Sequence, residues 1–237
     1  MIVICNGMPR SASTWSFNVA ARLLREVDGG GVYGGYCEEF TRFLQDVPPG
    51  MHGVVKCHSM ESKALEMGAR GAAKVIYTRR DLADALVSMM NMFGWDFEWS
   101  LSNLLRSLRF YRMHRDSGRA LIIDYDQIMS SPAQVIESMA AYLGVKSTPR
   151  LVAEVAAETS FDRMRQIVRQ IDQAPEDAGL VRVMNSAYDP QTLLHKHHIR
   201  DGRSGYGRLQ LTPEQLRCVD AINGLYGFVA GPAANAT

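Results

Sequence analysis

The sequence predicts a three-layer α/β fold, with a central parallel sheet between two layers of helices. Two observations indicate it. Short apolar, partly β-branched runs alternate along the chain with helical stretches, which is typical of strands buried on both faces of a parallel sheet. The first apolar run also leads through a turn rich in small residues into a new helix, the order in which many α/β folds build a ligand site.

The elements follow from this alternation. Strands are expected at four apolar runs: Ile2 to Cys5, Gly53 to Cys57, Lys74 to Tyr77 and Ala120 to Asp124. Helices are expected at six stretches: Thr14 to Val27, Ser62 to Gly68, Leu82 to Met92, Leu101 to His114, Pro132 to Leu143 and Pro213 to Tyr226. Proline opens the last two, so Ser130 or Ser131 and Thr212 are their expected caps.

One domain over residues 1–230 is expected, because 237 residues suit a single α/β domain and no linker is evident. The glycines at 29–31 and 34–35 indicate a flexible segment. Gln170 to Gly207 lacks periodicity and is expected to be a mobile loop near a substrate. Residues 231–237 are expected to form a flexible tail.

Composition excludes several classes of protein. A net charge of +1 argues against a broad nucleic-acid surface. The four cysteines lack CxxC spacing, which argues against a zinc site and fits free thiols in a reducing compartment. Neither a signal-peptide pattern nor an apolar run long enough to span a bilayer is found, so a cytoplasmic protein is expected.

The turn after the first strand has the layout of an anion site. A helix N-terminus presents amide N–H groups and a partial positive charge. Further donors come from the side chains of Arg10, Ser11, Ser13 and Thr14. The nucleotide P-loop pattern GxxxxGK[ST] fails, because Ala12 and Ser13 occupy the places of its second glycine and its lysine. An ordinary turn with a Ser or Thr cap is the alternative.

The stretch PRSASTW resembles the phosphosulfate-binding loop of sulfotransferases that use 3′-phosphoadenosine 5′-phosphosulfate (PAPS), where Pro-(Lys/Arg)-Ser-Gly-(Ser/Thr)-Thr-Trp is typical. The resemblance implies a P-loop-like sulfotransferase fold, PAPS as co-substrate and adenosine 3′,5′-bisphosphate (PAP) as product. The cofactor residues that it implies here are Pro9, Arg10, Ser11, Ala12, Ser13, Thr14 and Trp15.

The second predicted strand ends in Val-Lys-Cys-His, which resembles the family's Lys-Thr-His and implies that His58 is the catalytic base. An imidazole suits that task, because an acceptor hydroxyl must lose its proton as it attacks. Lys56 would add positive charge. Arg10 replaces a commoner lysine and is expected to act as an electrostatic clamp, since a guanidinium does not readily give up a proton. A histidine after a strand is, by itself, more often structural.

Residues 75–88, VIYTRRDLADALVS, resemble the family's 3′-phosphate motif. Alignment on Asp84 and Ser88 implies that Arg80, rather than Arg79, grips the 3′-phosphate together with the Ser88 hydroxyl. The alternative is an ion pair between Arg80 and Asp84 on a solvated helix face.

Two later segments also resemble the family. Trp15, Tyr125 and Phe161 are implied to surround the adenine, with Thr159 nearby, although each aromatic alone suits ordinary core packing. The stretch RDGRSGYGR resembles the glycine-rich loop that holds the 3′-phosphate. The loop residues that it implies are Arg200, Asp201, Gly202, Gly205 and, more weakly, Arg208. Two departures stand out, Asp201 for a usual Lys and Gly207 for a usual Trp.

The resemblance implies in-line transfer of the sulfuryl group to a hydroxyl or amine of a small-molecule, carbohydrate or natural-product acceptor, without a metal. A P-loop kinase that binds magnesium-ATP and a catalytically idle nucleotide-binding adaptor are the alternatives. The oligomeric state stays open.

The acceptor pocket is expected from the least patterned segments, Gly34 to Phe43, Phe93 to Trp99 and Gln170 to His198. Four aromatic residues indicate an apolar or aromatic acceptor or, alternatively, a core cluster: Phe93, Trp95, Phe97 and Trp99. The histidines at 195, 197 and 198 are expected to be solvated rather than metal ligands.

Overall fold

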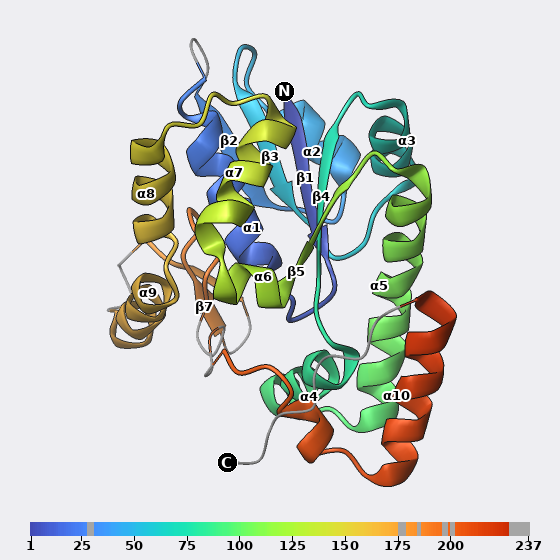
Figure 1. Cartoon of the computed structure of the whole chain (residues 1–237). Helices are drawn as coiled ribbons and strands as arrows, with labels where there is room; N and C mark the ends of the chain where they lie inside the picture. Colours follow the sequence, from blue (N-terminus) through green and yellow to red (C-terminus); the bar gives the residue numbers. More distant parts are fainter. Residues whose placement is uncertain (28–30, 175–178, 184–185, 196–198, 200–201, 228–237) are drawn as a thin grey trace.

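A computed structural model describes residues 1–27, 31–174, 179–183, 186–195, 199 and 202–227. Among them, five parallel strands form the central sheet in the order β2-β3-β1-β4-β5 (Figure 1). The strands are β1 (Ile2–Gly7), β2 (Val32–Tyr36), β3 (His52–Lys56), β4 (Lys74–Arg79) and β5 (Leu121–Asp124). A short antiparallel pair is formed by β6 (Val181–Val183) and β7 (Ser186–Tyr188).

Helices cover both faces of the sheet, which confirms the predicted three-layer α/β fold. They are α1 (Ser13–Leu24), α2 (Phe40–Asp46), α3 (Ser62–Arg70), α4 (Leu82–Phe93), α5 (Phe97–Ser117), α6 (Tyr125–Ser130), α7 (Pro132–Leu143), α8 (Pro149–Glu158), α9 (Phe161–Gln173) and α10 (Pro213–Tyr226), with a 3₁₀ turn η1 (Gly207–Leu209). Among the described residues, no helix is both long and apolar enough to cross a membrane.

The two layers bury opposite faces of each strand. Val3 and Cys5 of β1 lie in the core shared with α1, α7, α8 and α9, whereas Ile4 lies in the core shared with α2 and α3. This follows from the geometry of a strand, in which successive side chains point to opposite faces. A third cluster joins α4, α5 and α10, which lie together toward the bottom right of Figure 1.

Local signals explain where several helices begin. Thr212 is confirmed as the cap of α10, because its hydroxyl accepts the N–H of Gln215 and the Gln215 side chain accepts the N–H of Thr212. The α5 helix begins at Phe97, earlier than predicted, because the Asp96 side chain accepts the N–H of Trp99 at 2.8 Å.

Regular structure occupies part of each segment that was predicted to be flexible or mobile. The glycines at 34 and 35 lie in β2, where a Cβ on Gly34 would approach the Phe17 ring to 3.0 Å, so close packing explains at least that glycine. The stretch from 170 to 207 holds the end of α9 and the β6–β7 pair. The predicted tail, 231–237, lies outside the described residues.

The topology places a ligand site at the carboxyl ends of β1 and β3. The chain leaves β1 through α1, on one face of the sheet, and leaves β3 through α3, on the other face. Adjacent strands whose connections go to opposite faces leave a crevice at their carboxyl ends, and ligands of open α/β sheets bind there. In Figure 1 these ends lie at the lower edge of the sheet, above α4.

Candidate active site

A cavity of about 620 Å³ opens at this edge of the sheet. Its walls come from the loop after β1, the ends of β2 and β3, the helices α4 and α5, and the segment before η1. Most of the predicted site residues in the described part of the chain line this cavity, although they are spread from Pro9 to Gly202 in the sequence; the exceptions are Ser11, Gly205 and Arg208. The fold therefore brings the separate motifs to one place.

The loop after β1 is held close to β4. A Cβ on Gly7 would lie 2.3 Å from the Thr78 hydroxyl oxygen, so only glycine fits there. The Ser11 hydroxyl is buried and lies within hydrogen-bond distance of the carbonyl oxygens of Met8 and Thr78, and its amide donates to the Met8 carbonyl. The polar groups of Ser11 therefore fix the loop to the sheet, and its role toward the cofactor stays a prediction.

The start of α1 faces the cavity. Ala12 is the N-cap in the left-handed conformation, with φ of 71°, and makes no side-chain cap bond, so the alternative of an ordinary Ser or Thr cap does not apply. The first α1 amide paired within the helix is that of Ser16, which donates to the Ala12 carbonyl. The preceding amides, with Ser13 and Thr14 in the cavity wall, form the positive end of the helix dipole.

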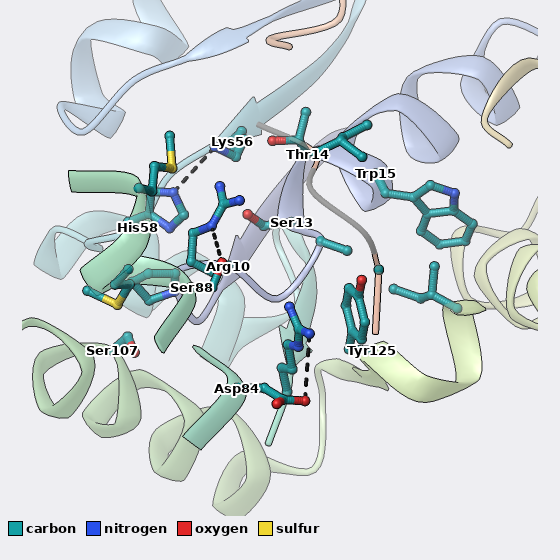
Figure 2. Close-up of a pocket in the computed structure, with 18 of the residues that line it drawn as sticks. Arg10, Ser13, Thr14, Trp15, Lys56, His58, Asp84, Ser88, Ser107 and Tyr125 are labelled. Carbon is teal, nitrogen blue, oxygen red and sulfur yellow. Dashed lines mark hydrogen bonds and ion pairs between the residues drawn. The ribbon is translucent and has the colours of Figure 1, made fainter. Parts of the chain in front are cut away.

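Two cations lie beside this helix end (Figure 2). Arg10 donates from Nε to the Ser88 hydroxyl at 3.0 Å. Burial, reinforced by the charge of Arg80, lowers the pKa of the Arg10 guanidinium. Lys56 is 7% exposed, and burial lowers the pKa of its ammonium to about 8. Desolvated cations gathered at a helix N-terminus favour an anion.

His58 lies next to Lys56, with 3.3 Å between its Nε2 and Lys56 Nζ. Its Nδ1 lies 3.4 Å from the Gly7 carbonyl oxygen. A carbonyl only accepts, so these contacts assign the proton to Nδ1 and leave Nε2 as an acceptor. Burial, followed by the Lys56 charge, lowers the pKa of His58 to about 3. The imidazole is therefore neutral at pH 7 and able to take up a proton.

Glu38, which the sequence analysis did not single out, lies beside His58 in the cavity wall. Its Oε1 accepts the His58 amide at 3.1 Å and the Tyr36 hydroxyl, and its Oε2 accepts the Ser59 amide at 2.9 Å and the Ser59 hydroxyl. Burial alone would raise the pKa of this carboxyl, but these hydrogen bonds outweigh it and hold the pKa below its usual value.

Arg80 points into the cavity and Arg79 does not. The Arg80 guanidinium lies 4.1 Å from the centre of the Tyr125 ring, and its Nε is buried without a hydrogen-bond partner among the described residues. Arg79 instead pairs with Asp124 and donates to the Tyr111 hydroxyl at 2.7 Å. This arrangement agrees with the alignment that placed Arg80 at the site.

Asp84 ties the glycine-rich segment to α4. Its carboxylate accepts the amides of Gly205 at 2.8 Å and Gly207 at 2.6 Å, and lies 3.6 Å from Arg80. The predicted pair of Arg80 and Asp84 therefore exists, but it is buried rather than solvated. A Cβ on Gly207 would lie 2.3 Å from the Ala83 backbone, which explains why no tryptophan stands at this position.

The rest of this segment is only partly described. Gly202, in the left-handed conformation with φ of 72°, lines the cavity. Arg208 pairs with Asp220 and does not line it. Arg200 and Asp201 lie outside the described residues.

The aromatic side chains predicted around the adenine line one end of the cavity: Trp15, Tyr125 and Phe161. Trp15 donates from its indole N–H to the Thr159 carbonyl at 3.0 Å, which fixes the ring. The Thr159 hydroxyl donates to the Val155 carbonyl, so it closes the end of α8. This end therefore offers aromatic faces rather than polar groups.

The other end, beyond His58, is lined by apolar side chains of α4 and of the loop after it, and by a mostly polar stripe of α5. Phe93 and Trp95 stack with 4.4 Å between ring centroids and line the cavity. Phe97 is instead buried in the core and Trp99 is 51% exposed, so the predicted aromatic group divides. One stripe of α5 faces the cavity: Asn103, Arg106, Ser107 and Phe110.

Among the described residues, no group of three or more His, Cys, Asp or Glu side chains is arranged to hold a metal ion. The charged lining is instead dominated by arginine and lysine, which suits an anionic ligand.

Comparisons with known proteins agree with this geometry. A family profile described as a sulfotransferase domain matches residues 52–224, more than half of the chain. No curated protein matches the chain in sequence.

Solved structures share the fold. A mouse sulfotransferase, SULT7A1, complexed with PAP has 18% identity and a TM-score of 0.67, with 95% of this chain and 83% of that one covered. A retinol dehydratase in complex with retinol and PAP has 14% identity and a TM-score of 0.68, with 100% and 83% covered. The same enzyme appears with androsterone and inactive cofactor PAP, at 14% identity, a TM-score of 0.66, and 100% and 82% covered.

Proposed function

Since the chain belongs to the sulfotransferase family, we propose that it transfers a sulfuryl group from PAPS to a hydroxyl or amine of a small-molecule acceptor. The observation that carries this proposal is the meeting of the α1 N-terminus, Arg10, Lys56 and His58 at one cavity. PAPS supplies the sulfuryl group when bound, and the three compared structures hold its product, PAP.

The residues present fit this nucleotide. Arg80 Nε is buried without a partner among the described residues, and a 3′-phosphate oxygen would satisfy it. Ser88 and Gly202 line the same region. The start of α1, with Arg10 and Lys56, would hold the phosphosulfate, and Trp15, Tyr125, Phe161 and Thr159 would surround the adenine.

His58 would act as the general base. Its Nε2 has one lone pair, which faces the Lys56 ammonium at 3.3 Å, so this ammonium would turn to the bound phosphosulfate before Nε2 takes the proton of the acceptor hydroxyl. The Nδ1–H would stay directed at the Gly7 carbonyl, which holds the imidazole in one tautomer. A base with a pKa near 3 is weak, but the neighbouring cations lower that pKa in part. Negative charge bound beside Lys56 and Arg10 would raise it.

Arg10 would stabilise negative charge on the leaving oxygen, with the α1 amides, and would not donate a proton. Lys56 adds a second charge, and at pH 7 its ammonium is mostly protonated despite the lowered pKa. Because Ser88 already holds Arg10 in place, the guanidinium needs little reorganisation to meet the negative charge on the leaving oxygen.

The acceptor would enter beside α4 and α5. Met89, Met92, Phe93, Trp95 and Phe110 give this end of the cavity an apolar wall, which suits a largely apolar small molecule. The retinol and androsterone bound in the compared structures have this character.

The chain lacks the second glycine and the lysine of the nucleotide P-loop, which argues against a kinase. A catalytically idle adaptor would have no need of a neutral His58 beside two cations. Thermal melting with PAP, PAPS and magnesium-ATP separates the three. A ligand at about a hundred times its Kd adds roughly 2.7 kcal/mol of stability. We expect stabilisation by PAP and PAPS; a shift with magnesium-ATP alone would favour a kinase, and none with any ligand an adaptor.

The His58→Ala variant tests the base directly. We expect it to bind PAP as the unchanged protein does and to lose at least a hundredfold in kcat, the lower end of general-base catalysis. The matched control is His52→Ala, because His52 begins strand β3 and so lies at the other end of the strand that leads to His58. Unchanged turnover in His58→Ala would refute the assignment.

A further inference from the structure

The carboxylate of Glu38 joins two strand ends of the active site. Tyr36 ends β2 and Lys56 ends β3, and these two residues are partners in the parallel pairing. Continued by two residues, the same register brings Glu38 beside His58. Cys37 extends the pairing in this direction, since its amide donates to the Lys56 carbonyl. Glu38 therefore lies beside the turn that follows β3, which is the segment that contains His58.

We propose that Glu38 is the positioning residue of the catalytic base: its carboxylate fixes the turn after β3 so that the His58 imidazole faces the acceptor end of the cavity. This proposal rests on the proposed role of His58. Glu38 acts through the His58 and Ser59 amides and does not itself exchange a proton with the acceptor.

The number and kind of donors require an ionised carboxylate. Glu38 receives four hydrogen bonds, two on each oxygen, from Tyr36, His58 and both donors of Ser59. An amide side chain would offer one accepting oxygen and would direct N–H groups at the donors of the other pair. Hydrogen bonds to a charged acceptor are about twice as strong as neutral ones, so the turn depends on the charge.

Tyr36 extends this support to the charged side of the site. Its ring lies 5.3 Å from Lys56 Nζ, measured to the ring centroid, and 6.3 Å from the His58 ring. Its hydroxyl is the fourth donor to Glu38. Tyr36 therefore links Glu38, the base and its neighbouring cation in one network.

The next residue provides a natural comparison. Glu39 has the same side chain, is exposed and does not line the cavity. It is the N-cap residue of α2, but its side chain makes no cap bond. If a negative charge anywhere in this loop were sufficient, the two glutamates would be interchangeable.

The test compares Glu38→Gln with the control Glu39→Gln and with Ser59→Ala, which removes one donor and keeps the backbone contacts. Three quantities are measured: the PAP dissociation constant, the kcat for sulfation of a phenol acceptor, and the ¹⁵N–¹H spectrum of the His58 ring. The His58 signal is identified among the six histidines by its loss in His58→Ala.

We expect Glu38→Gln to lower kcat ten- to a hundredfold, the effect of a small misplacement of a catalytic group, with the PAP dissociation constant changed by less than about twofold. The spectrum should change from the single Nδ1–H form to a mixture of tautomers. Ser59→Ala should lower kcat about fivefold, the effect of one hydrogen bond, and Glu39→Gln should match the unchanged protein.

The proposal is overturned if Glu38→Gln keeps both its kcat and its His58 spectrum. It is also overturned if kcat and PAP affinity fall together, because general damage to the fold would then explain both. If Glu38→Gln does not fold, the spectrum and kcat of Ser59→Ala decide. A failure of the proposed function looks different: the unchanged protein would sulfate no acceptor, while the spectra would still report whether Glu38 orients His58.

Discussion

Replacing Asp84 by asparagine should loosen the wall of the cavity that holds Arg80. Asp84 is 3% exposed, and its two carboxylate oxygens accept one amide each, from Gly205 and from Gly207. Asparagine retains the shape but replaces one oxygen with an NH₂ group, so one glycine amide loses its acceptor. A buried amide without a partner costs about 1–3 kcal/mol, and the weaker bond at the remaining oxygen about 1 kcal/mol more.

The expected loss is therefore about 2–4 kcal/mol in the free energy of unfolding. For a chain of this length, that lowers the melting temperature by roughly 5–15 °C. Asp84→Ala should cost about 3–5 kcal/mol, because it removes both acceptors and the partner of Arg80. Asp116→Asn is the control, since Asp116 forms only exposed ion pairs on α5, and surface pairs contribute little.

Urea unfolding measures the stability, and PAP titration measures the site. PAP affinity should fall in Asp84→Asn, because the carboxylate that orients Arg80 is lost. A melting temperature within about a degree of that of Asp116→Asn would refute the reasoning, since it would show that the two glycine amides gain nothing from a carboxylate.

Two further predictions concern stability. Ala12→Gly should raise the free energy of unfolding by about 0.5–1 kcal/mol, since Ala12 has a φ of 71° and glycine adopts this conformation without strain; a lower melting temperature would contradict it. Burial lowers the pKa of His114 to about 4, so the unfolded chain binds more protons between pH 4 and 6.5, and stability is lost as pH falls through that range. At pH 5 the loss is about 2 kcal/mol. Because His58 contributes a similar loss in both proteins, the loss between pH 7 and 5 should be smaller by about this amount in His114→Phe, measured by urea unfolding, and an equal loss in both proteins would contradict the prediction.

Regular elements were predictable from sequence because each depends on its own residues. The runs Lys74 to Tyr77 and Pro132 to Leu143 carry a strand and a helix in patterns that need no distant partner. The β2 strand was missed because its glycines suggest flexibility. Gly34 in fact packs closely against Phe17 of α1, and no local pattern reveals that contact.

The same distinction divides the candidate site. Arg80 was chosen over Arg79 by aligning Asp84 and Ser88 with the family motif that this stretch resembles. The structure places Arg80 in the cavity, while Arg79 pairs with Asp124. Glu38 was missed because its importance depends on the register between β2 and β3, which brings it to a histidine 20 residues away. Asp84 was expected to pair along its helix, whereas its main partners are glycine amides more than 120 residues later.

The cavity-facing side of α5 shows why hydrophobic periodicity does not predict a surface that faces a ligand. On α5, Leu104 and Leu108 face the core, and the adjacent stripe with Asn103, Arg106 and Ser107 faces the cavity. A helix that packs against the core on one face and lines a cavity on the next has two inward faces of different polarity. The separation of apolar from polar residues in its sequence is therefore weaker than in an ordinary surface helix. Polar residues next to an apolar stripe usually indicate solvent. Here they indicate a cavity, because α4 and the end of β3 close the space above them, and only the tertiary arrangement distinguishes the two cases.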